Sequence, residues 1–183
     1  MSNVSILDPR AFVESSVLDA VSSAGGPVGA LKGKKIGIRI DEMWESWEWV
    51  ADEWASSLRG LGAEPRVWRA PIVKGAKVES AGAEFADFNA DVDAAIVGLC
   101  NCGSCSFWAI HDALGSLDSG LPTLVVATAH FERLARMLAT KGGRPDVRMV
   151  VLPYPLEGRK ESEVREIARQ YFDQALETFG AVK

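Results

Sequence analysis

Five short apolar runs, separated by amphipathic stretches, constrain the fold of this chain more than any other feature. Each run is rich in β-branched residues and is bounded by Gly, Pro or Asp, which is typical of strands buried on both faces of a sheet. The runs are residues 34–40, 64–69, 92–100, 121–128 and 147–153. Their alternation with helical stretches predicts an α/β fold with a mostly parallel sheet.

Apolar residues at three- and four-residue steps predict the helices of this fold. The predicted helices are residues 44–58, 131–138 and 161–179, and a further helix begins near Ser104. We therefore expect three layers: a flavodoxin-like, mostly parallel sheet of about five strands, with helices on both faces.

The first 33 residues lack this alternation. Ala11 to Ser22 has the pattern of a short helix, and AGGPVGALKG after it is interpreted as an extended arm. We predict an N-terminal arm over residues 1–33 and a single α/β domain over residues 34–183. The stretch from Ile72 to Asn89 is predicted to be irregular, and its length favours a functional loop or a subunit contact.

Composition narrows the class of partner. A chain of 183 residues, 48% hydrophobic, can bury an ordinary core without disulfides or metals. A formal charge of -5 argues against nucleic acid or an acidic membrane surface, so we expect a small-molecule substrate. The N-terminus lacks a signal-peptide pattern and no apolar run is long enough to span a bilayer, so we expect a cytoplasmic protein. A homodimer is the commonest assembly for such a chain.

The stretch GLCNCGSCSFW holds the three cysteines of the chain, at C-x-C-x-x-C spacing. In a reducing cytosol such a cluster indicates catalysis or metal binding. Cys102 and Cys105 follow the third strand, where the next helix begins and where ligands bind in open α/β sheets. A helix N-terminus lowers the pKa of a thiol. We therefore predict Cys102 as the nucleophile and Cys105, in the first helical turn, as the resolving thiol.

Neighbouring residues in the turn are predicted to support the thiols. Gly103 allows the tight strand-to-helix connection, and Ser104 can cap the helix. Backbone N–H groups from Gly103 to Cys105 would stabilise developing negative charge. Asn101, Gly103 and Ser104 are candidate substrate-binding residues.

Polar side chains after other strands are predicted to converge on the same crevice. Asp41 follows the first strand, His130 the fourth and Tyr154 the fifth. His130 is the candidate general acid and base, because the pKa of imidazole lies near neutrality. Asp41 and Tyr154 are candidate substrate-binding residues, and Trp44 could wall the pocket.

Each of these residues has a structural alternative. Asp41 could cap the Trp-rich helix, and His130 could cap the following helix or make an ordinary hydrogen bond in the core. The tryptophans of the first helix are most simply packing residues. His111 lies well inside the helix after CGSC, so we expect it to be packed or surface-facing rather than catalytic.

A metal site is the alternative use of the cysteines. Cys100, Cys102 and Cys105, with His130 as a fourth ligand, could bind zinc or copper. Structural zinc sites usually contain two C-x-x-C or Cys/His pairs, whereas this chain has one, and Cys100 ends a strand with its side chain on an alternating face. We therefore expect neither a metal nor a cofactor.

Several stretches resemble the UGSC family, bacterial proteins named for a Sec-Gly-Ser-Cys motif, in a form that contains cysteine. They are DAAIVGLCNCGSCSFWAIHDAL, SGLPTLVVATAHFERLA, VRMVVLPYPLEGR, ILDP and LKGKKIGI, which together extend over nearly the whole chain. CGSC, GLPTLVVAT and LPYPLEG are more distantly similar to the selenocysteine subunits of glycine, betaine and D-proline reductases, in which a selenolate takes part in reductive cleavage of a carbon–heteroatom bond.

The resemblance implies that Cys102 occupies the selenocysteine position and Cys105 that of the partner thiol. Three departures limit the transfer: sulfur replaces selenium, the first helix is Trp-rich, and Cys100 adds a thiol. The leading hypothesis is a thiol enzyme for redox or reductive cleavage chemistry on a small electrophile, with a reductant protein or partner subunit that resets the pair. The alternatives are a non-redox cysteine lyase or hydrolase, and a metal-thiolate or structural subunit of a complex.

Overall fold

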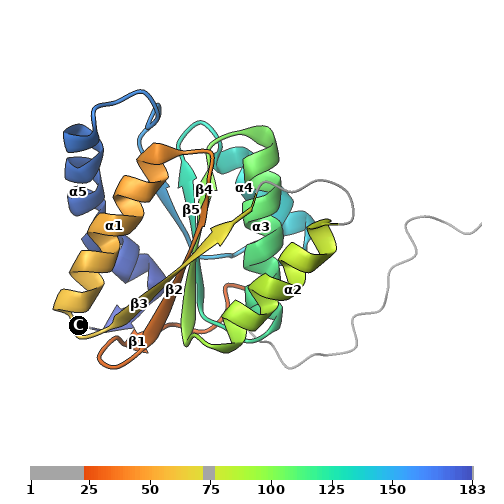
Figure 1. Ribbon diagram of the computed structural model, residues 1–183. Helices are drawn as coiled ribbons and strands as arrows, with labels where there is room; N and C mark the ends of the chain where they lie inside the picture. The colour runs from red at the N-terminus through yellow and green to blue at the C-terminus, as the bar shows by residue number, and fades with distance from the viewer. Residues whose placement is uncertain (1–22, 72–76, 183) are drawn as a thin grey trace, which may run out of the picture.

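A five-stranded parallel sheet forms the middle layer of the protein, as seen in a computed structural model that describes residues 23–71 and 77–182 (Figure 1). Its strands are Lys35–Asp41 (β2), Glu64–Ala70 (β3), Ala94–Cys100 (β4), Thr123–Thr128 (β5) and Met149–Leu152 (β6). They lie in the order β3-β2-β4-β5-β6, and every pair is parallel. All five predicted strands are confirmed, and the order is that of a flavodoxin-like fold.

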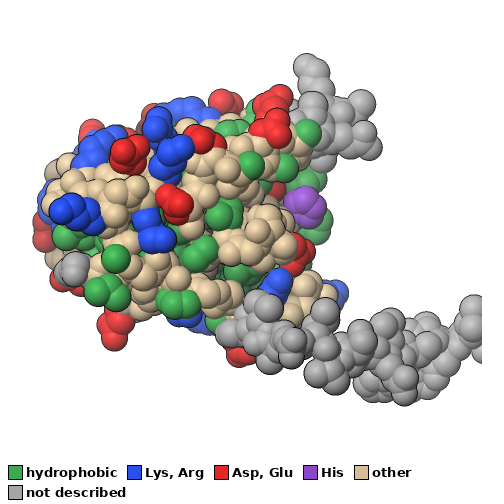
Figure 2. All heavy atoms as spheres, turned by 90° about the horizontal axis from the view of Figure 1, so that it is seen from below, with side chains coloured by type: hydrophobic (Ala, Val, Ile, Leu, Met, Phe, Trp, Pro, Cys, Tyr) green, Lys and Arg blue, Asp and Glu red, His purple; other side chains and the backbone are tan. Residues whose placement is uncertain are grey.

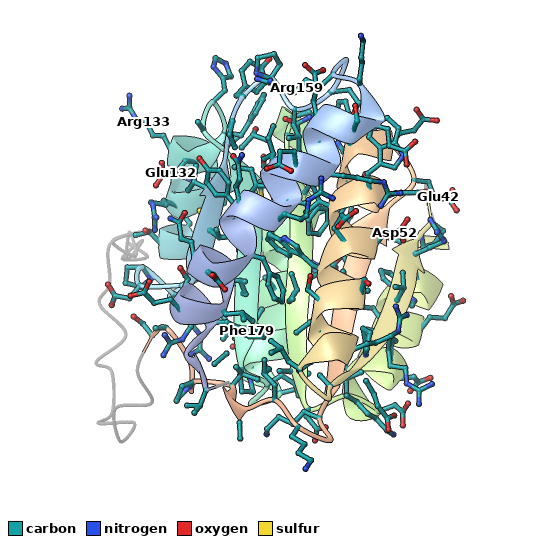
Figure 3. All side chains as sticks on the ribbon, turned by 90° about the vertical axis from the view of Figure 1, so that its left-hand side faces the viewer. Glu42, Asp52, Glu132, Arg133, Arg159 and Phe179 are labelled. Atoms are coloured by element: carbon teal, nitrogen blue, oxygen red, sulfur yellow. A yellow bond between two sulfur atoms is a disulfide. The ribbon has the colours of Figure 1, made fainter. Side chains whose placement is uncertain are left out.

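Helices cover both faces of this sheet, as predicted. Glu45–Gly60 (α1) and Glu161–Phe179 (α5) lie on one face, and Lys77–Ala90 (α2), Gly103–Asp118 (α3) and Glu132–Lys141 (α4) lie on the other (Figure 1). Figure 3 looks onto the first face, where α1 and α5 lie side by side. Arg165 of α5 lies 3.4 Å from Glu53 and 3.6 Å from Asp52 of α1.

Alternation along the strands divides the core into two layers. Ile36, Ile38 and Ile40 of β2 pack with the buried face of α1 and α5. Ala95 and Val97 of β4 point the other way and pack with α3 and α4. The central strands are buried on both faces, which is why their sequences are almost continuously apolar.

The strand order places a crevice between β2 and β4. The chain runs from β2 outward to β3 and then returns to β4 on the other side of β2. The loops after β2 and β4 therefore leave the sheet in opposite directions, which is the place where open α/β sheets bind ligands. Figure 2 shows the opposite end of the molecule, where acidic and basic side chains are interspersed.

The prediction of an irregular stretch from Ile72 to Asn89 is wrong over most of its length, because α2 occupies Lys77–Ala90. Residues 72–76 lie outside the described residues. Phe85 and Phe88 of α2 pack against Trp68 of β3, with ring centroids 4.7 and 6.5 Å away. Small and polar residues dominate this helix, so its apolar periodicity is weak and the tertiary contact with Trp68 determines its packed face.

The end of the predicted N-terminal arm is part of the packed structure. Gly29–Ala30 (β1) pairs in parallel with Ala181–Val182 (β7), and Val28 and Leu31 are buried. This pair of short strands was not predicted from the sequence. The possible helix from Ala11 to Ser22 lies outside the described residues, and the division into arm and domain stays a prediction.

None of the helices in the described part of the chain has the length and apolar character needed to cross a membrane.

Candidate functional site

Cys102 and Cys105 lie where β4 passes into α3, and a disulfide joins them. Cys102 is the N-cap residue of α3, and its Sγ accepts a hydrogen bond of 3.0 Å from the backbone N–H of Cys105. The prediction that Ser104 caps this helix is wrong, because the helix begins at Gly103. Ser104 lies in the first turn instead, with its Oγ 3.4 Å from Cys102 Sγ.

The two sulfurs of the pair have different surroundings. Cys102 is half-buried, whereas Cys105 is 6% exposed. The indole N–H of Trp44 donates to Cys105 Sγ at 3.3 Å, and Met43 Sδ lies 3.9 Å from the same sulfur. Trp44 thus lies against the pair, while Trp47 and Trp54 of α1 are fully buried in the core.

Cys100 is separated from the pair by its position in the sheet. It is the last residue of β4 and is fully buried among Ala109, Ile110 and their neighbours. Burial raises the pKa of its thiol to about 12. Among the residues that the structure describes, no three His, Cys, Asp or Glu side chains are arranged to hold a metal ion, so Cys100, Cys102, Cys105 and His130 do not form a ligand set.

A cavity of about 320 Å³ adjoins Cys105 at the carboxyl ends of β2 and β3. Among the described residues, its polar lining comes from Arg39, Asp41, Ser104, Cys105, His111 and Asp112. Its apolar lining includes Met43, Trp68 and Trp108. Cys102 does not line the cavity itself, but its sulfur contacts Ser104, which does.

A buried ion cluster forms the floor of this cavity. Arg39 is 4% exposed and donates through Nε to Asp112 Oδ2 at 2.9 Å and through Nη1 to the carbonyl oxygen of Gly98 at 2.8 Å. Its Nη1 also lies 3.5 Å from Asp41 Oδ2. One guanidinium therefore faces two carboxylates, and it links β2 to β4 and α3.

Asp41 closes the turn after β2. Its carboxylate accepts hydrogen bonds from the backbone N–H of Met43 at 3.1 Å and of Leu99 at 3.4 Å. Burial raises the pKa of this carboxyl group, and the opposing effect of Arg39 is smaller. The alternative that Asp41 caps the Trp-rich helix is wrong, because Trp44 is the N-cap residue of α1.

Three other predicted site residues lie elsewhere. His130 and Tyr154 are exposed and stack on each other, with ring centroids 4.8 Å apart. Asn101 is buried, and its Oδ1 accepts from Thr128 Oγ1 at 2.9 Å, which ties the end of β4 to that of β5. None of these three lines the cavity beside Cys105, and neither Trp44 nor Gly103 is among its lining residues. His130 does not cap the following helix either, because Phe131 is the N-cap residue of α4.

Several lining residues were not predicted, although the sequence contains two signals for them. Arg39 is a charged residue between two isoleucines in the interior of β2, which is costly unless the charge is paired. Trp108 and Asp112 follow Cys105 by three and seven residues, a spacing that places all three on one face of a helix. His111, which was not predicted to belong to the site, also lines the cavity.

Comparison with known proteins gives one family. The model of the UGSC family matches residues 5–181. No curated protein matches the sequence.

Two solved structures are similar to the chain. One is a flavo di-iron protein mutant from Thermotoga maritima, with 18% identity and a TM-score of 0.49 over 79% of this chain and 36% of that chain. The other, described as a putative D-3-phosphoglycerate dehydrogenase oxidoreductase from Ralstonia solanacearum, has 18% identity and a TM-score of 0.38 over 82% of this chain and 46% of that chain. The chain thus spans less than half the length of either protein.

Proposed function

Because this chain belongs to the UGSC family, we propose that it is a cytoplasmic thiol-dependent enzyme that uses Cys102 and Cys105 for redox or reductive cleavage chemistry on a small electrophile. The observation that carries the proposal is the position of the pair. Two cysteines close enough to bond lie at the N-terminus of α3, beside a cavity at the crevice between β2 and β4.

The surroundings of the pair suit a nucleophilic thiolate. After reduction, Cys102 Sγ would still face the N–H of Cys105 and the positive end of the helix dipole, both of which stabilise a negative charge. Cys102 is also the more exposed sulfur. The Sγ of Cys105 is close enough to form a disulfide with Cys102, so it can displace a group that is bound to the Cys102 sulfur.

The reaction would proceed in two steps. The Cys102 thiolate attacks a carbon that carries a heteroatom group X, forming a carbon–sulfur bond and releasing X with the bonding electron pair. Cys105, as thiolate, then attacks Cys102 Sγ; the disulfide forms, and the carbon leaves with its electron pair and takes up a proton. The substrate gains two electrons and the two thiols lose them, so an external dithiol must reduce the disulfide after each turnover.

Two histidines compete as the proton donor. His130 is our candidate from sequence, because it follows β5 at the same edge of the sheet. His111 is favoured by its place in the cavity wall, with its Nδ1 3.4 Å from Asp112 Oδ1. A comparison of His130→Gln with His111→Gln decides between them: loss of the basic or acidic limb of the pH–rate profile identifies the donor.

Thiol labelling of the reduced protein tests the proposal. Iodoacetamide is applied across pH, and each cysteine peptide is measured by mass spectrometry. We expect Cys102 to react well below the pKa of an ordinary thiol, about 8.5, and Cys105 to react more slowly. If Cys102 reacts no faster than glutathione at every pH, the proposal is wrong. If all three cysteines are protected until a chelator is added, the metal-thiolate alternative holds instead.

Trapping separates redox chemistry from covalent lyase or hydrolase chemistry. With an α-haloketone substrate, whose enolate is a far better leaving group than the acetamide carbanion that an iodoacetamide adduct would have to release, the Cys105→Ser variant should accumulate an adduct on Cys102. The unaltered protein should form the Cys102–Cys105 disulfide and the dehalogenated product in equal amounts. Turnover without any dithiol would establish the non-redox alternative.

A further inference from the structure

The groove between α2 and α3 is larger than the cavity at Cys105 alone. A second cavity, of about 470 Å³, shares Gly82, His111 and Asp112 with the first and continues along α2 and α3 towards Asn89 and Leu121. The two cavities meet at these shared residues. A molecule with one end at Cys105 can therefore extend past Asp112 towards Asn89.

The charges around the groove do not balance. Among the described residues of the two linings, Arg39, Asp41 and Asp112 are charged, and their formal sum is one negative charge with His111 neutral. The guanidinium of Arg39 is already hydrogen-bonded to Asp112 and to the Gly98 carbonyl group and is ion-paired with Asp41. A ligand carboxylate in the groove would thus be repelled by Asp41 and Asp112, while Arg39 is already paired with them. This repulsion is stronger in a site of reduced dielectric constant than in water.

A second and independent feature lies at the far end of the groove. Asn89 is 7% exposed and donates through Nδ2 to Ser116 Oγ at 3.0 Å. Its Oδ1 is buried and has no hydrogen-bond partner among the described residues. A buried acceptor without a donor is costly, so a ligand that brings an N–H or O–H group to this point gains a hydrogen bond and removes that cost.

The walls between these points are apolar. Trp68 and Trp108 flank the first cavity, and Phe85 and Leu121 line the second. Aromatic walls bind flat or aliphatic groups, and their faces also attract cations.

From these features we infer that the substrate of the Cys102–Cys105 site is an apolar or aromatic molecule that carries no carboxylate. One end of this molecule carries a hydrogen-bond donor, preferably an ammonium group, and this end reaches Asn89 and Asp112. The identification of this ligand as the substrate rests on the proposed function. The binding chemistry of the groove does not depend on the thiols.

Three probes of matched shape test the inference: benzylamine, benzyl alcohol and phenylacetate, which are cationic, neutral and anionic at neutral pH. Dissociation constants are measured by ligand-observed NMR on the full chain with the disulfide intact, at low ionic strength. We expect benzylamine to bind at least about tenfold more tightly than phenylacetate, with benzyl alcohol between them. Phenylacetate binding as tightly as benzylamine, or none of the three binding, overturns the inference.

A pair of variants locates the donor site. Asn89→Ala removes the free acceptor and also the hydrogen bond to Ser116, whereas Ser116→Ala removes that hydrogen bond and leaves Oδ1 of Asn89 in place. Asn89→Ala should raise the dissociation constants of benzylamine and benzyl alcohol by about five- to tenfold. Ser116→Ala should raise them by less than about twofold. Equal effects of the two variants would mean that the donor site is wrong and that only packing was changed.

The outcome is separable from that of the thiol proposal. The probes bind the oxidised protein without reacting, so a reversed charge preference overturns the substrate class and leaves labelling of Cys102 as it was. Conversely, unreactive thiols with the expected probe preference overturn the enzyme proposal and leave the groove as a binding site for amines.

Discussion

The three cysteines lie within six residues of one another, yet each has a different environment. Cys102 caps a helix, Cys105 faces a cavity and an indole N–H, and Cys100 is enclosed in the core. At the scale of the residue, neighbours rather than spacing therefore determine which sulfur can react.

Cys100 should be inert in the folded protein. Burial raises the pKa of its thiol to about 12, so almost no thiolate exists at neutral pH. Burial also keeps reagents in solution away from the sulfur. Iodoacetamide at about pH 8 should leave its peptide unmodified, whereas the unfolded protein, as control, should be modified at all three cysteines. Native-state labelling of Cys100 would show that the end of β4 is open.

Trp44 should tune the redox equilibrium of the pair. Its indole N–H donates to Cys105 Sγ, and such a bond stabilises a thiolate more than a disulfide sulfur. Trp44→Phe should therefore lower the midpoint potential by about 10–30 mV, the equivalent of one hydrogen bond. The measurement is equilibration in dithiothreitol redox buffers, followed by thiol quantification.

The control for this variant is Trp49→Phe, which changes a partly buried tryptophan in the first turns of α1. It should leave the midpoint potential within a few millivolts. An equal shift in both variants would assign the effect to packing of α1 rather than to the hydrogen bond.

Asp41 should make stability depend on pH in an unusual direction. Its pKa is raised above the ordinary 3.8, so the folded protein holds this proton more tightly than the unfolded chain does, and ionisation costs stability. The stability of the unaltered protein relative to Asp41→Asn should fall as pH rises from about 4 to about 7. Urea unfolding of both proteins across this pH range measures this relative stability. If the unaltered protein instead became more stable relative to Asp41→Asn as pH rises, the pairing of Asp41 with Arg39 would outweigh the effect of burial.

At the scale of elements, the backbone of β4 at Gly98 lies directly against the side chain of Trp47 of α1. A Cβ atom at this position would lie 2.7 Å from the ring of Trp47, which is itself fully buried and bonded to the Arg39 carbonyl group. This close approach brings the Leu99 N–H and the Gly98 carbonyl group to Asp41 and Arg39. The absence of a side chain at Gly98 therefore helps to hold the ion cluster under the cavity.

Gly98→Ala should destabilise the protein by about 1–3 kcal/mol, because Trp47 has no space into which it can move. Urea unfolding gives the free-energy change. Gly60→Ala at the end of α1 is the matched control, since an added Cβ there meets no atom within 4 Å, and it should change stability by less than about 0.5 kcal/mol. Equal stability of the two variants would contradict the close contact.

At the scale of the whole molecule, the two ends of the described chain close on each other. The N–H groups of Val28 and Gly29 donate to the carbonyl groups of Phe179 and Gly180, and Leu31 is 1% exposed in the core beneath α5. The segment before β2 thus contributes to the same core as the sheet.

Leu31→Ala should lower the free energy of unfolding by about 2–5 kcal/mol, the usual cost of a cavity in a core. Thermal or urea unfolding should remain a single transition. A cost near zero would show that this segment is a separable arm and that the domain begins at residue 34. Light scattering on the same samples tests the predicted homodimer.

Much of the architecture could be predicted from local pattern. The five strands, the helices over both faces and the position of CGSC at a strand-to-helix junction follow from periodicity of two and of 3.6 residues and from Gly and Pro. α2 was missed because few of its residues are apolar, and β1 and β7 because two-residue strands have no periodicity. Helix capping was assigned to Ser104 rather than Cys102, a difference of two residues that pattern alone does not resolve.

Local periodicity and one short motif are enough to predict the layers, the family resemblance and the place of the cysteine pair in the chain. The three-dimensional structure sets which polar groups share the cavity. It brought Arg39, His111 and Asp112 to Cys105 and left His130 and Tyr154 stacked on each other elsewhere. The reason is physical: whether two side chains meet depends on strand order, helix rotation and the pairing of a buried charge, all of which involve residues far apart in the chain.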